Sequence, residues 1–324
     1  MTEGRIAGLT AILITSCLWG TTGTAATFAP AAGPLAIGAA ALGIGGLLQA
    51  AVAVPALRDS RAALRDHLPL IVVGAVSVAV YPLAFYSSMH LAGVAVGSVV
   101  SLASAPLASA VLERFVDRRA SGLGRRWALA AGLGVVGSVL LCASTFEGSA
   151  ASPGSTIAGV ALGLAAGSTY ATYSWAVQGL IGRGLGRAAS MGAVFGGGGA
   201  LLLPVLFLTG APLVASPEAF LVAAYMALIP MFLGYLLFGF GLTRVPASTA
   251  TTLTLTEPAV AAVLAVLIVG ERLAPLGWVG LAILGVVLVV LATAPAGRAV
   301  PAVLPARAGS AGTAGEPASA VPES

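Results

Sequence analysis

The chain has 324 residues, of which 58% are apolar and only 8% are charged, and its mean hydropathy is +1.03. A water-soluble domain of this length could not bury so much apolar surface, so the composition excludes a soluble globular protein. The net charge of +4 does not indicate nucleic-acid binding, because no basic patch is interleaved with aromatic residues.

Ten apolar stretches follow one another along the chain. Each is close to the roughly 20 residues that a helix needs to cross about 30 Å of hydrocarbon. Lipid offers no hydrogen-bond partner to an open strand edge, so the stretches predict helices and an all-α polytopic membrane protein. The ten predicted spans are Ile6–Phe28, Leu35–Leu57, Leu68–Met89, Val94–Phe115, Trp127–Phe146, Ile157–Leu180, Ala188–Leu208, Phe220–Leu242, Ala247–Val269 and Leu276–Ala294.

The fifth and tenth stretches share a motif that indicates an internal repeat. Trp127 and Gly134 in the fifth correspond to Trp278 and Gly285 in the tenth, at an offset of 278 − 127 = 151 residues. Because five helices is an odd number, residues 149–294 are expected to repeat residues 1–148 in the opposite sense across the bilayer. Such inverted repeats are typical of alternating-access transporters. Residues 295–324 are rich in Pro, Ala, Gly and Ser and predict a disordered cytoplasmic tail.

The distribution of arginine predicts the orientation in the membrane. The chain has no Lys, and its 15 basic residues are all Arg. With the N-terminus in the cytoplasm and the spans alternating, all of them except Arg272 fall on the cytoplasmic side. This bias follows the positive-inside rule, so we expect a bacterial inner-membrane protein with both termini cytoplasmic. The alternative, a cleaved signal sequence in place of the first span, is disfavoured because the apolar stretch is longer than a signal core.

Residue types that bind metals or catalyse reactions are scarce in the predicted spans. His67 and His90 lie outside them, and Cys17 and Cys142 have no clustered His nearby, so we expect no metal site, no cofactor and no membrane-embedded enzyme. The absence of Lys excludes a Walker loop and therefore ATP-driven transport on this chain. An ion gradient would have to drive transport, or the protein is a facilitator.

Two motifs resemble one family of transporters. The run from Leu255-Thr256-Glu257-Pro258 to Gly270-Glu271-Arg272, followed by Trp278, resembles the ninth and tenth helices of the EamA-like drug/metabolite transporters. Leu18-Trp19-Gly20-Thr21 resembles their opening Trp-Gly motif. The resemblance implies export of small metabolites, such as amino acids or related amines, coupled to protons. The first span has no acidic residue, unlike the small multidrug exporters of the same superfamily, so a polyaromatic drug is a less expected substrate.

Glu257 is the candidate for proton coupling or for binding a substrate ammonium. It stands near the middle of the ninth span, where an ionisable side chain costs roughly 2.5–3.5 kcal/mol, so it should face the bundle interior. Pro258 removes one backbone hydrogen bond and predicts a helix break beside it. Thr254 precedes Glu257, and a stripe of hydroxyls that could line the same cavity comprises Ser248, Thr252 and Thr256. The alternative is a neutral, hydrogen-bonded Glu that closes the helix break.

Aromatic side chains with polar tips predict a cavity for a partly apolar metabolite near the bilayer midplane. The candidates on the first helices of the two halves are Trp19, Tyr170 and Tyr173, and those on the third helices are Tyr81, Phe85, Tyr86 and Tyr235. Packing or an interfacial belt is the alternative for each. Ser101 on the fourth helix, between Ser98 and Ser104, is a further candidate, although small residues at this spacing usually mark close packing.

Several other residues predict contacts between helices. Gln49 and Gln178 predict interhelical hydrogen bonds, and Gly196 to Gly199 predict either a hinge or tight packing. The expected site lies between the first, third, fourth, sixth, eighth and ninth helices. The expected partners are a small-molecule substrate, the lipid bilayer and a proton, and both a monomer and a dimer remain open. The alternative function is an uncoupled facilitator or a flippase for a lipid-linked metabolite.

Overall fold

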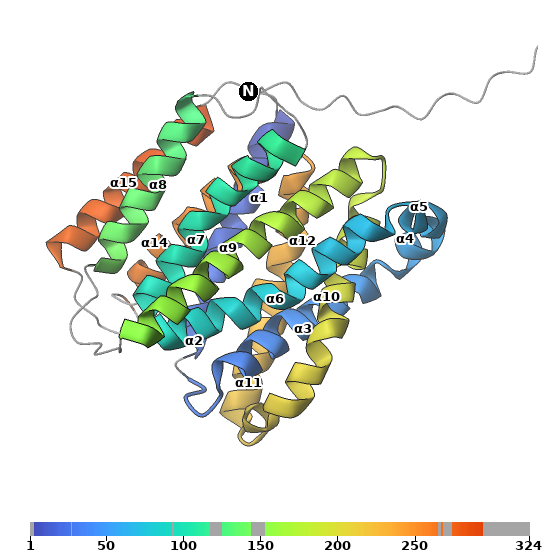
Figure 1. The fold of residues 1–324 in the computed structure, drawn as a ribbon, viewed down its shortest axis with the longest axis horizontal. Coiled ribbons are helices and arrows are strands. Elements are labelled where there is room, and N and C mark those ends of the chain that lie inside the picture. Colours follow the sequence, from blue (N-terminus) through green and yellow to red (C-terminus); the bar gives the residue numbers. More distant parts are fainter. Residues whose placement is uncertain are drawn as a thin grey trace, which may run out of the picture.

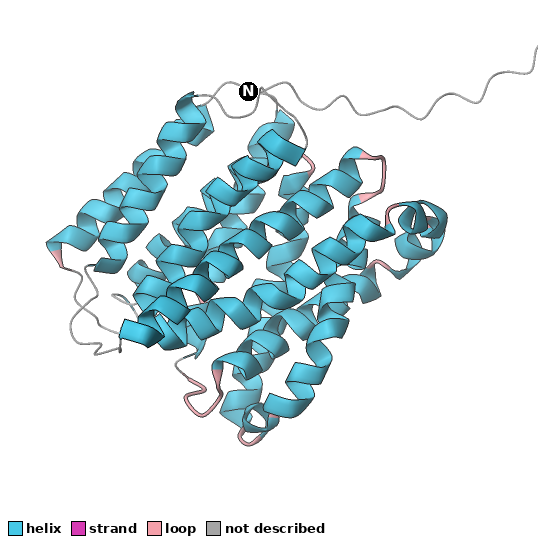
Figure 2. Cartoon of the chain, viewed as in Figure 1, coloured by secondary structure: helices cyan, strands magenta, loops and turns pink. Residues whose placement is uncertain are grey.

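The structure is a computed structural model that describes residues 3–26, 28–92, 94–116, 125–143, 153–264, 267 and 274–293. Within these residues the chain is built of helices and short connections, without a strand (Figure 2). The first half comprises α1 (Glu3–Gly20), α2 (Thr22–Ala26), α3 (Pro34–Val52), α4 (Val54–Asp59), α5 (Arg61–Asp66), α6 (Leu68–Ala92), α7 (Val94–Val111), the π-helix η1 (Leu112–Val116) and α8 (Arg125–Ala143). The predicted tail lies outside the described residues.

The second half is also helical within the described residues. It comprises α9 (Pro153–Gly182), α10 (Arg187–Thr209), the 3₁₀ turn η2 (Ala211–Val214), α11 (Pro217–Met226), the π-helix η3 (Ala227–Leu233), α12 (Gly234–Leu242), α13 (Ala247–Leu253), the 3₁₀ turn η4 (Thr254–Thr256), α14 (Glu257–Leu264) and α15 (Pro275–Thr293). The Gly270-Glu271-Arg272 motif lies outside the described residues.

Helices occur at each of the ten predicted spans. Pro34 and Pro217 stand in the first turns of α3 and α11, where a missing N–H costs nothing. Ser216 caps α11, because its side chain accepts a hydrogen bond from the Ala219 N–H at 3.1 Å. Pro230 lies inside η3, where the eighth helix is locally wider than an α-helix. The sequence did not predict this widening or the short helices α4 and α5.

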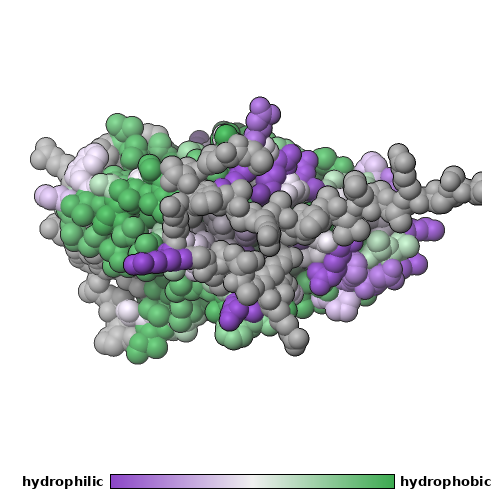
Figure 3. All heavy atoms as spheres, turned by 90° about the horizontal axis from the view of Figure 1, so that it is seen from above, coloured by the Kyte–Doolittle hydropathy of each residue, from purple (hydrophilic) through white to green (hydrophobic). Residues whose placement is uncertain are grey.

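Six described helical segments are long and apolar enough to cross a membrane. They are Glu3–Ala26, Pro34–Val52, Leu68–Ala92, Gly97–Val116, Arg187–Thr209 and Pro217–Leu242. Shorter apolar helices cover Trp127–Leu140 and Pro275–Val287. Large apolar side chains are exposed along several of these helices, with Phe207 and Leu208 more than four-fifths exposed. A surface of this kind suits contact with lipid, and Figure 3 shows apolar side chains gathered over one side of the bundle.

The long helices pack in a defined set of neighbours (Figure 1). α6 lies against α9, α3 against α10, α7 against α9, and α1 against α12. α8 and α15 pack against each other at one edge of the bundle. The N-terminal end of α1, the α4–α5 segment and the α9–α10 connection lie toward the upper right of the view. Exposed charged side chains at this end include Arg58, Arg61, Arg65, Arg183 and Arg187.

Glycines let α3 and α10 approach closely. A Cβ at Gly199 would lie 2.6 Å from the Gly43 carbonyl oxygen and 2.9 Å from the Leu47 nitrogen. Both atoms belong to the backbone of α3 and cannot turn aside. Of the two interpretations that the sequence left open for Gly196 to Gly199, tight packing is therefore present.

Gln49, which is buried, and Gln178, which is partly buried, join helices as predicted. The Gln49 Nε2 donates to the Phe232 carbonyl at 2.8 Å, which ties α3 to η3. The Gln178 Nε2 donates to the Val245 carbonyl at 2.9 Å, which ties α9 to the segment before α13. Each bond satisfies a backbone group that lipid could not.

Candidate functional site

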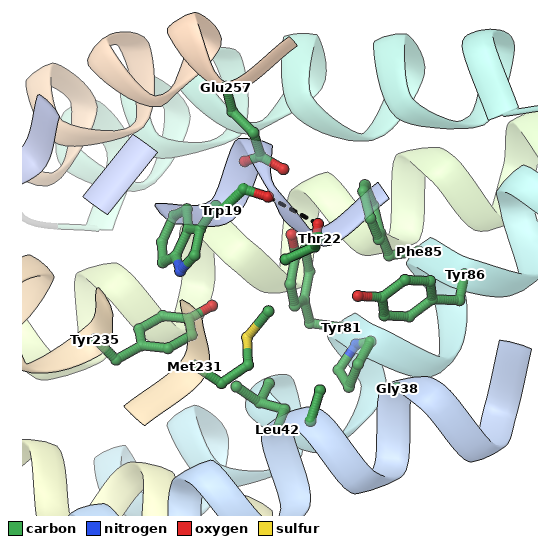
Figure 4. A pocket seen from close by; sticks show the side chains of 12 residues that line it. Trp19, Thr22, Gly38, Leu42, Tyr81, Phe85, Tyr86, Met231, Tyr235 and Glu257 are labelled. Atoms are coloured by element: carbon green, nitrogen blue, oxygen red, sulfur yellow. Dashed lines mark hydrogen bonds between the residues drawn. The ribbon is translucent and has the colours of Figure 1, made fainter. Parts of the chain in front are cut away.

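A small cavity lies among the helices (Figure 4). Its wall comes from five of the ten predicted spans. The lining residues are Trp19, Thr22, Gly38, Ala41, Leu42, Tyr81, Pro82, Phe85, Tyr86, Met231, Tyr235 and Glu257. Most of the wall is apolar or aromatic, with a few polar groups, which is the usual composition of a small-molecule site.

Glu257 supplies the acidic group of the cavity. It is the first residue of α14, directly after the 3₁₀ turn η4, and Pro258 follows it. The side chain is only 9% exposed, and its carboxylate has no hydrogen bond or ion pair with any described residue. Figure 4 shows the carboxylate pointing from α14 toward the space between the aromatic rings. A buried carboxylate of this kind is costly unless a proton or a cation neutralises it.

Hydroxyl groups border the same space. Figure 4 shows the hydroxyls of Tyr81, Tyr86 and Tyr235 directed toward its centre. The Tyr235 hydroxyl is also 2.7 Å from that of Tyr173. Thr22 donates from Oγ1 to the Trp19 carbonyl at 2.7 Å and so closes the end of α1. The cavity therefore offers several neutral donors and acceptors around a single carboxylate.

The cavity wall is backed by a cluster of packed aromatic rings. The Trp19 ring centroid is 4.8 Å from that of Tyr235 and 5.4 Å from that of Phe238. The Trp19 Nε1 donates to the Pro230 carbonyl at 2.9 Å. Tyr81 packs against Tyr170 at 5.6 Å. Rings held on several sides in this way form a wall with little freedom to rearrange.

Six predicted cavity residues line it, namely Trp19, Tyr81, Phe85, Tyr86, Tyr235 and Glu257. The others lie behind its wall or elsewhere. Tyr170 and Thr254 are buried, and their hydroxyls lie 2.9 Å apart. Tyr173 contacts two residues that line the cavity, Tyr235 and Tyr81. Ser101 is fully buried where α7 packs on α9, and its Oγ has no hydrogen-bond partner among the described residues.

The predicted stripe of hydroxyls on the ninth helix does not line the cavity. Thr252 donates to the Ser248 carbonyl at 2.7 Å, and Thr256 donates to the Leu253 carbonyl at 2.8 Å. Ser248 bonds instead to Glu113 of η1. These hydroxyls satisfy backbone and buried groups, a role that the pattern alone does not distinguish from cavity lining.

The second predicted span contributes to the cavity, although the sequence placed the site without it. Gly38 lies so close to α6 that a Cβ there would be 3.0 Å from the Tyr86 ring and 3.1 Å from the Pro82 carbonyl oxygen. The wall also uses Ala41 and Leu42 of α3. Small apolar residues carry no functional signal in a sequence, which is why they were missed. The fourth and sixth spans, which were expected at the site, do not line it.

Among the residues that line the cavity, Glu257 alone carries a formal charge, and no basic side chain faces it there. Over the described part of the chain, no group of three or more His, Cys, Asp or Glu could hold a metal ion. The arrangement can therefore bind a proton or a small cation at the carboxylate and contact apolar groups through the rings.

Two of the comparisons with known proteins cover nearly the whole chain, and one covers a part of it. The sequence profile of the EamA-like transporter family matches residues 157–293. The uncharacterized transporter YwfM of Bacillus subtilis (strain 168) is 34% identical over 286 residues, which cover 88% of this chain and 93% of that protein. A protein of known crystal structure superposes with a TM-score of 0.71 at 20% identity, over 90% of this chain and 96% of that one. At this identity the likeness concerns the fold alone.

Proposed function

Because the chain belongs to the EamA-like transporter family, whose members are membrane transporters of the drug/metabolite superfamily, we propose that it exports small metabolites across the bacterial inner membrane. The substrates are amino acids or related amines, and export is coupled to protons by alternating access. The observation that carries the proposal is the cavity with its single, unpaired carboxylate.

Glu257 is the coupling residue in this proposal. Its carboxylate is nine-tenths buried, faces the cavity and has no partner among the described side chains. Burial of an unpaired charge is expensive, so the group is stable when a proton or a substrate ammonium occupies it. Exchange of a proton for a substrate ammonium at this carboxylate would couple proton movement to substrate export. The aromatic rings of Trp19 and Phe85 would contact the rest of the substrate.

Ten spans in two inverted repeats are the architecture that we propose for this transport. The helix contacts support it. A two-fold axis in the membrane plane requires that each contact between helices either joins two counterparts or occurs twice, once on each side of the axis. The second helix packs on the seventh (α3 on α10), the fourth on the ninth (α7 on α13) and the fifth on the tenth (α8 on α15). The contact between the third and sixth helices (α6 on α9) corresponds under this symmetry to the contact between the eighth and first helices (α12 on α1).

The proposal is tested by efflux of a labelled panel of amino acids and amines from cells. The cells express the wild type, Glu257→Gln or Glu218→Gln at equal membrane levels. Glu218 is an exposed carboxylate at the start of α11 and serves as the matched control. We expect one or more substrates to leave faster with the wild type and the control, and collapse of the proton gradient to abolish the difference.

The Glu257→Gln variant should export substrate more slowly by about tenfold or more, because it loses the charged partner of the proton or substrate ammonium. A loss of about 1.4 kcal/mol in that interaction already changes the binding constant tenfold. If the variant exports as fast as the wild type and without a proton gradient, the carboxylate does not couple transport and the uncoupled facilitator is correct. If no member of the panel moves with the wild type, the substrate class is wrong, and lipid-linked metabolites are the next to test.

A further inference from the structure

A second buried carboxylate, Glu113, lies far from the cavity and bridges the two halves of the chain. It stands in η1, at the end of the fourth span, and is 4% exposed. Its Oε1 accepts a hydrogen bond from the Ser248 N–H at 2.8 Å, and its Oε2 accepts one from the Ser248 Oγ at 2.8 Å. Ser248 is the second residue of α13, in the second half of the chain.

Two more residues, Gln178 and Ser109, hold the same part of the chain through hydrogen bonds. The Gln178 Oε1 accepts from the Ala247 N–H at 3.2 Å, while its Nε2 donates to the Val245 carbonyl. The Thr251 Oγ1 lies 3.2 Å from the Ser109 Oγ of α7. We call this set the inner clamp, which consists of Ser109, Glu113, Gln178, Thr251 and the segment 245–248. Side chains from α7, η1 and α9 thus fix the first turn of α13 through several bonds.

The inner clamp lies at the end of the bundle that contains the chain's N-terminus. A Cβ at Gly8, early in α1, would lie 2.7 Å from the Cβ of Arg244, just before the clamp segment. The cavity lies farther from this end of the bundle than the clamp does, because it is lined by Trp19 at the far end of α1 and by Thr22 of α2. Glu257 comes nine residues after Ser248, or roughly 14 Å along the helix.

The two ends of the ninth span therefore differ in how they are held. At the clamp, carboxylate, amide and hydroxyl groups bond directly to the start of α13. At the cavity, the Glu257 carboxylate has no bond to a described residue. Between the two lie buried side chains, including Leu253 and Tyr170.

We propose that the inner clamp is the cytoplasmic gate of the transporter, and that Glu113 is the positioning residue that keeps it shut. This inference rests on the proposed function. The structure then corresponds to the state closed toward the cytoplasm. Substrate can enter from the cytoplasm only after the start of α13 moves away from η1 and α9, which requires the bonds to Ser248 and Ala247 to break.

Cysteine accessibility in inverted membrane vesicles tests the gate. The reporter is Thr252→Cys, one turn beyond Ser248 and fully buried, in a chain whose native cysteines are removed (Cys17→Ser, Cys142→Ser). A membrane-impermeant maleimide labels it slowly while the clamp is closed. Adding Glu113→Ala should accelerate labelling by about tenfold, since hydrogen bonds to a charged group shift an opening equilibrium by that factor or more.

Three further variants distinguish opening of the clamp from a general loosening of the bundle. Gln178→Ala removes another arm of the clamp and should accelerate labelling in the same direction, which keeps the test valid if Glu113→Ala does not reach the membrane. Ser88→Ala removes an equally buried interhelical bond, from the Ser88 Oγ to the Gly159 carbonyl at 2.7 Å, and should leave labelling unchanged. Glu113→Gln keeps an acceptor oxygen and should give an intermediate rate.

Unchanged labelling in both Glu113→Ala and Gln178→Ala would overturn the gate. So would an equal acceleration in Ser88→Ala, because the effect would then not belong to the clamp. The assay uses no substrate, so its outcome is independent of whether the efflux panel identifies one. A successful efflux panel with unchanged labelling would leave the transport function standing and remove the gate alone.

Discussion

Trp19 holds two parts of the cavity wall together, because its indole both donates a hydrogen bond and packs against rings of other helices. Its Nε1 fixes the Pro230 carbonyl in η3, and its ring contacts Tyr235 and Phe238 of α12. The same residue lines the cavity. It is therefore a structural residue and a candidate binding residue at once.

Replacing Trp19 by Phe tests the structural part. The Trp19→Phe variant loses the donor to Pro230, and we expect its free energy of unfolding to fall by about 1–2 kcal/mol. Thermal unfolding in detergent measures the change. The control is Trp278→Phe, because Trp278 is 56% exposed on α15 and its removal should change little. Equal melting temperatures for the two variants would contradict the role of the Trp19 bond.

At the scale of residues, the sequence points to positions where the residue type is unusual within an apolar span, and the role of these residues in binding stays a prediction. A lone Glu and large aromatic residues within apolar spans stand out, and Trp19, Tyr81, Tyr235 and Glu257 do line the cavity. Hydroxyl residues carry a weaker signal, since each can bond to a carbonyl of its own helix, as Thr252 does. Glu113 escaped notice because its partner, Ser248, lies 135 residues away in the chain.

At the scale of helices, the contact between α3 and α10 depends on the absence of side chains. Gly46 of α3 meets the backbone of α10 at Phe195 and Gly199. Close backbone approach of this kind is a common basis of helix association in membranes, where burial of apolar surface provides no driving force. The glycines therefore determine how near the second and seventh spans can lie.

A methyl group at this contact should push the helices apart. For Gly199→Ala we expect a loss of about 1–3 kcal/mol in stability, because the new Cβ would meet backbone atoms of Gly43 and Leu47 that cannot rotate away. Gly132→Ala on α8 is the control, since nothing lies within 4 Å of its Cβ position. Heat-dependent loss of the monodisperse fraction in detergent measures both variants, and a stable Gly199→Ala protein would refute the packing argument.

Helix positions followed from hydropathy, but their interruptions did not. The ten predicted spans coincide with helices because length and apolar content are properties of each segment alone. Pro230 lies inside η3, and Pro258 follows the 3₁₀ turn η4 and Glu257. Of these interruptions, the break beside Pro258 was predicted from the sequence.

At the scale of the whole molecule, the distribution of exposed arginines predicts how the helix bundle is oriented in the membrane. Exposed arginines of α4, α5 and the α9–α10 connection lie at the end of the bundle that contains the start of α1. From the positive-inside rule we predict that this end faces the cytoplasm. The connection between α10 and α11, which includes the exposed Val214, lies at the opposite end.

Single cysteines test this orientation in intact cells. In the background without native cysteines, Val214→Cys should react with an impermeant maleimide from outside. Ala62→Cys, exposed in α5, should react only after the membrane is permeabilised. The opposite pattern would place the N-terminus outside and would exchange the two faces of the proposed transport cycle.

The 3₁₀ turn η4 has a geometric consequence for Glu257. A 3₁₀ helix advances about 120° and about 2.0 Å per residue, whereas an α-helix advances about 100° and about 1.5 Å. Over Thr254–Thr256 the difference amounts to about 60° of rotation and about 1.5 Å of length. This twist changes the direction in which Glu257 points relative to Ser248 and Thr252. Relaxation of three residues would swing the carboxylate by a sixth of a revolution, so the break sets the azimuth of the charge as well as its depth.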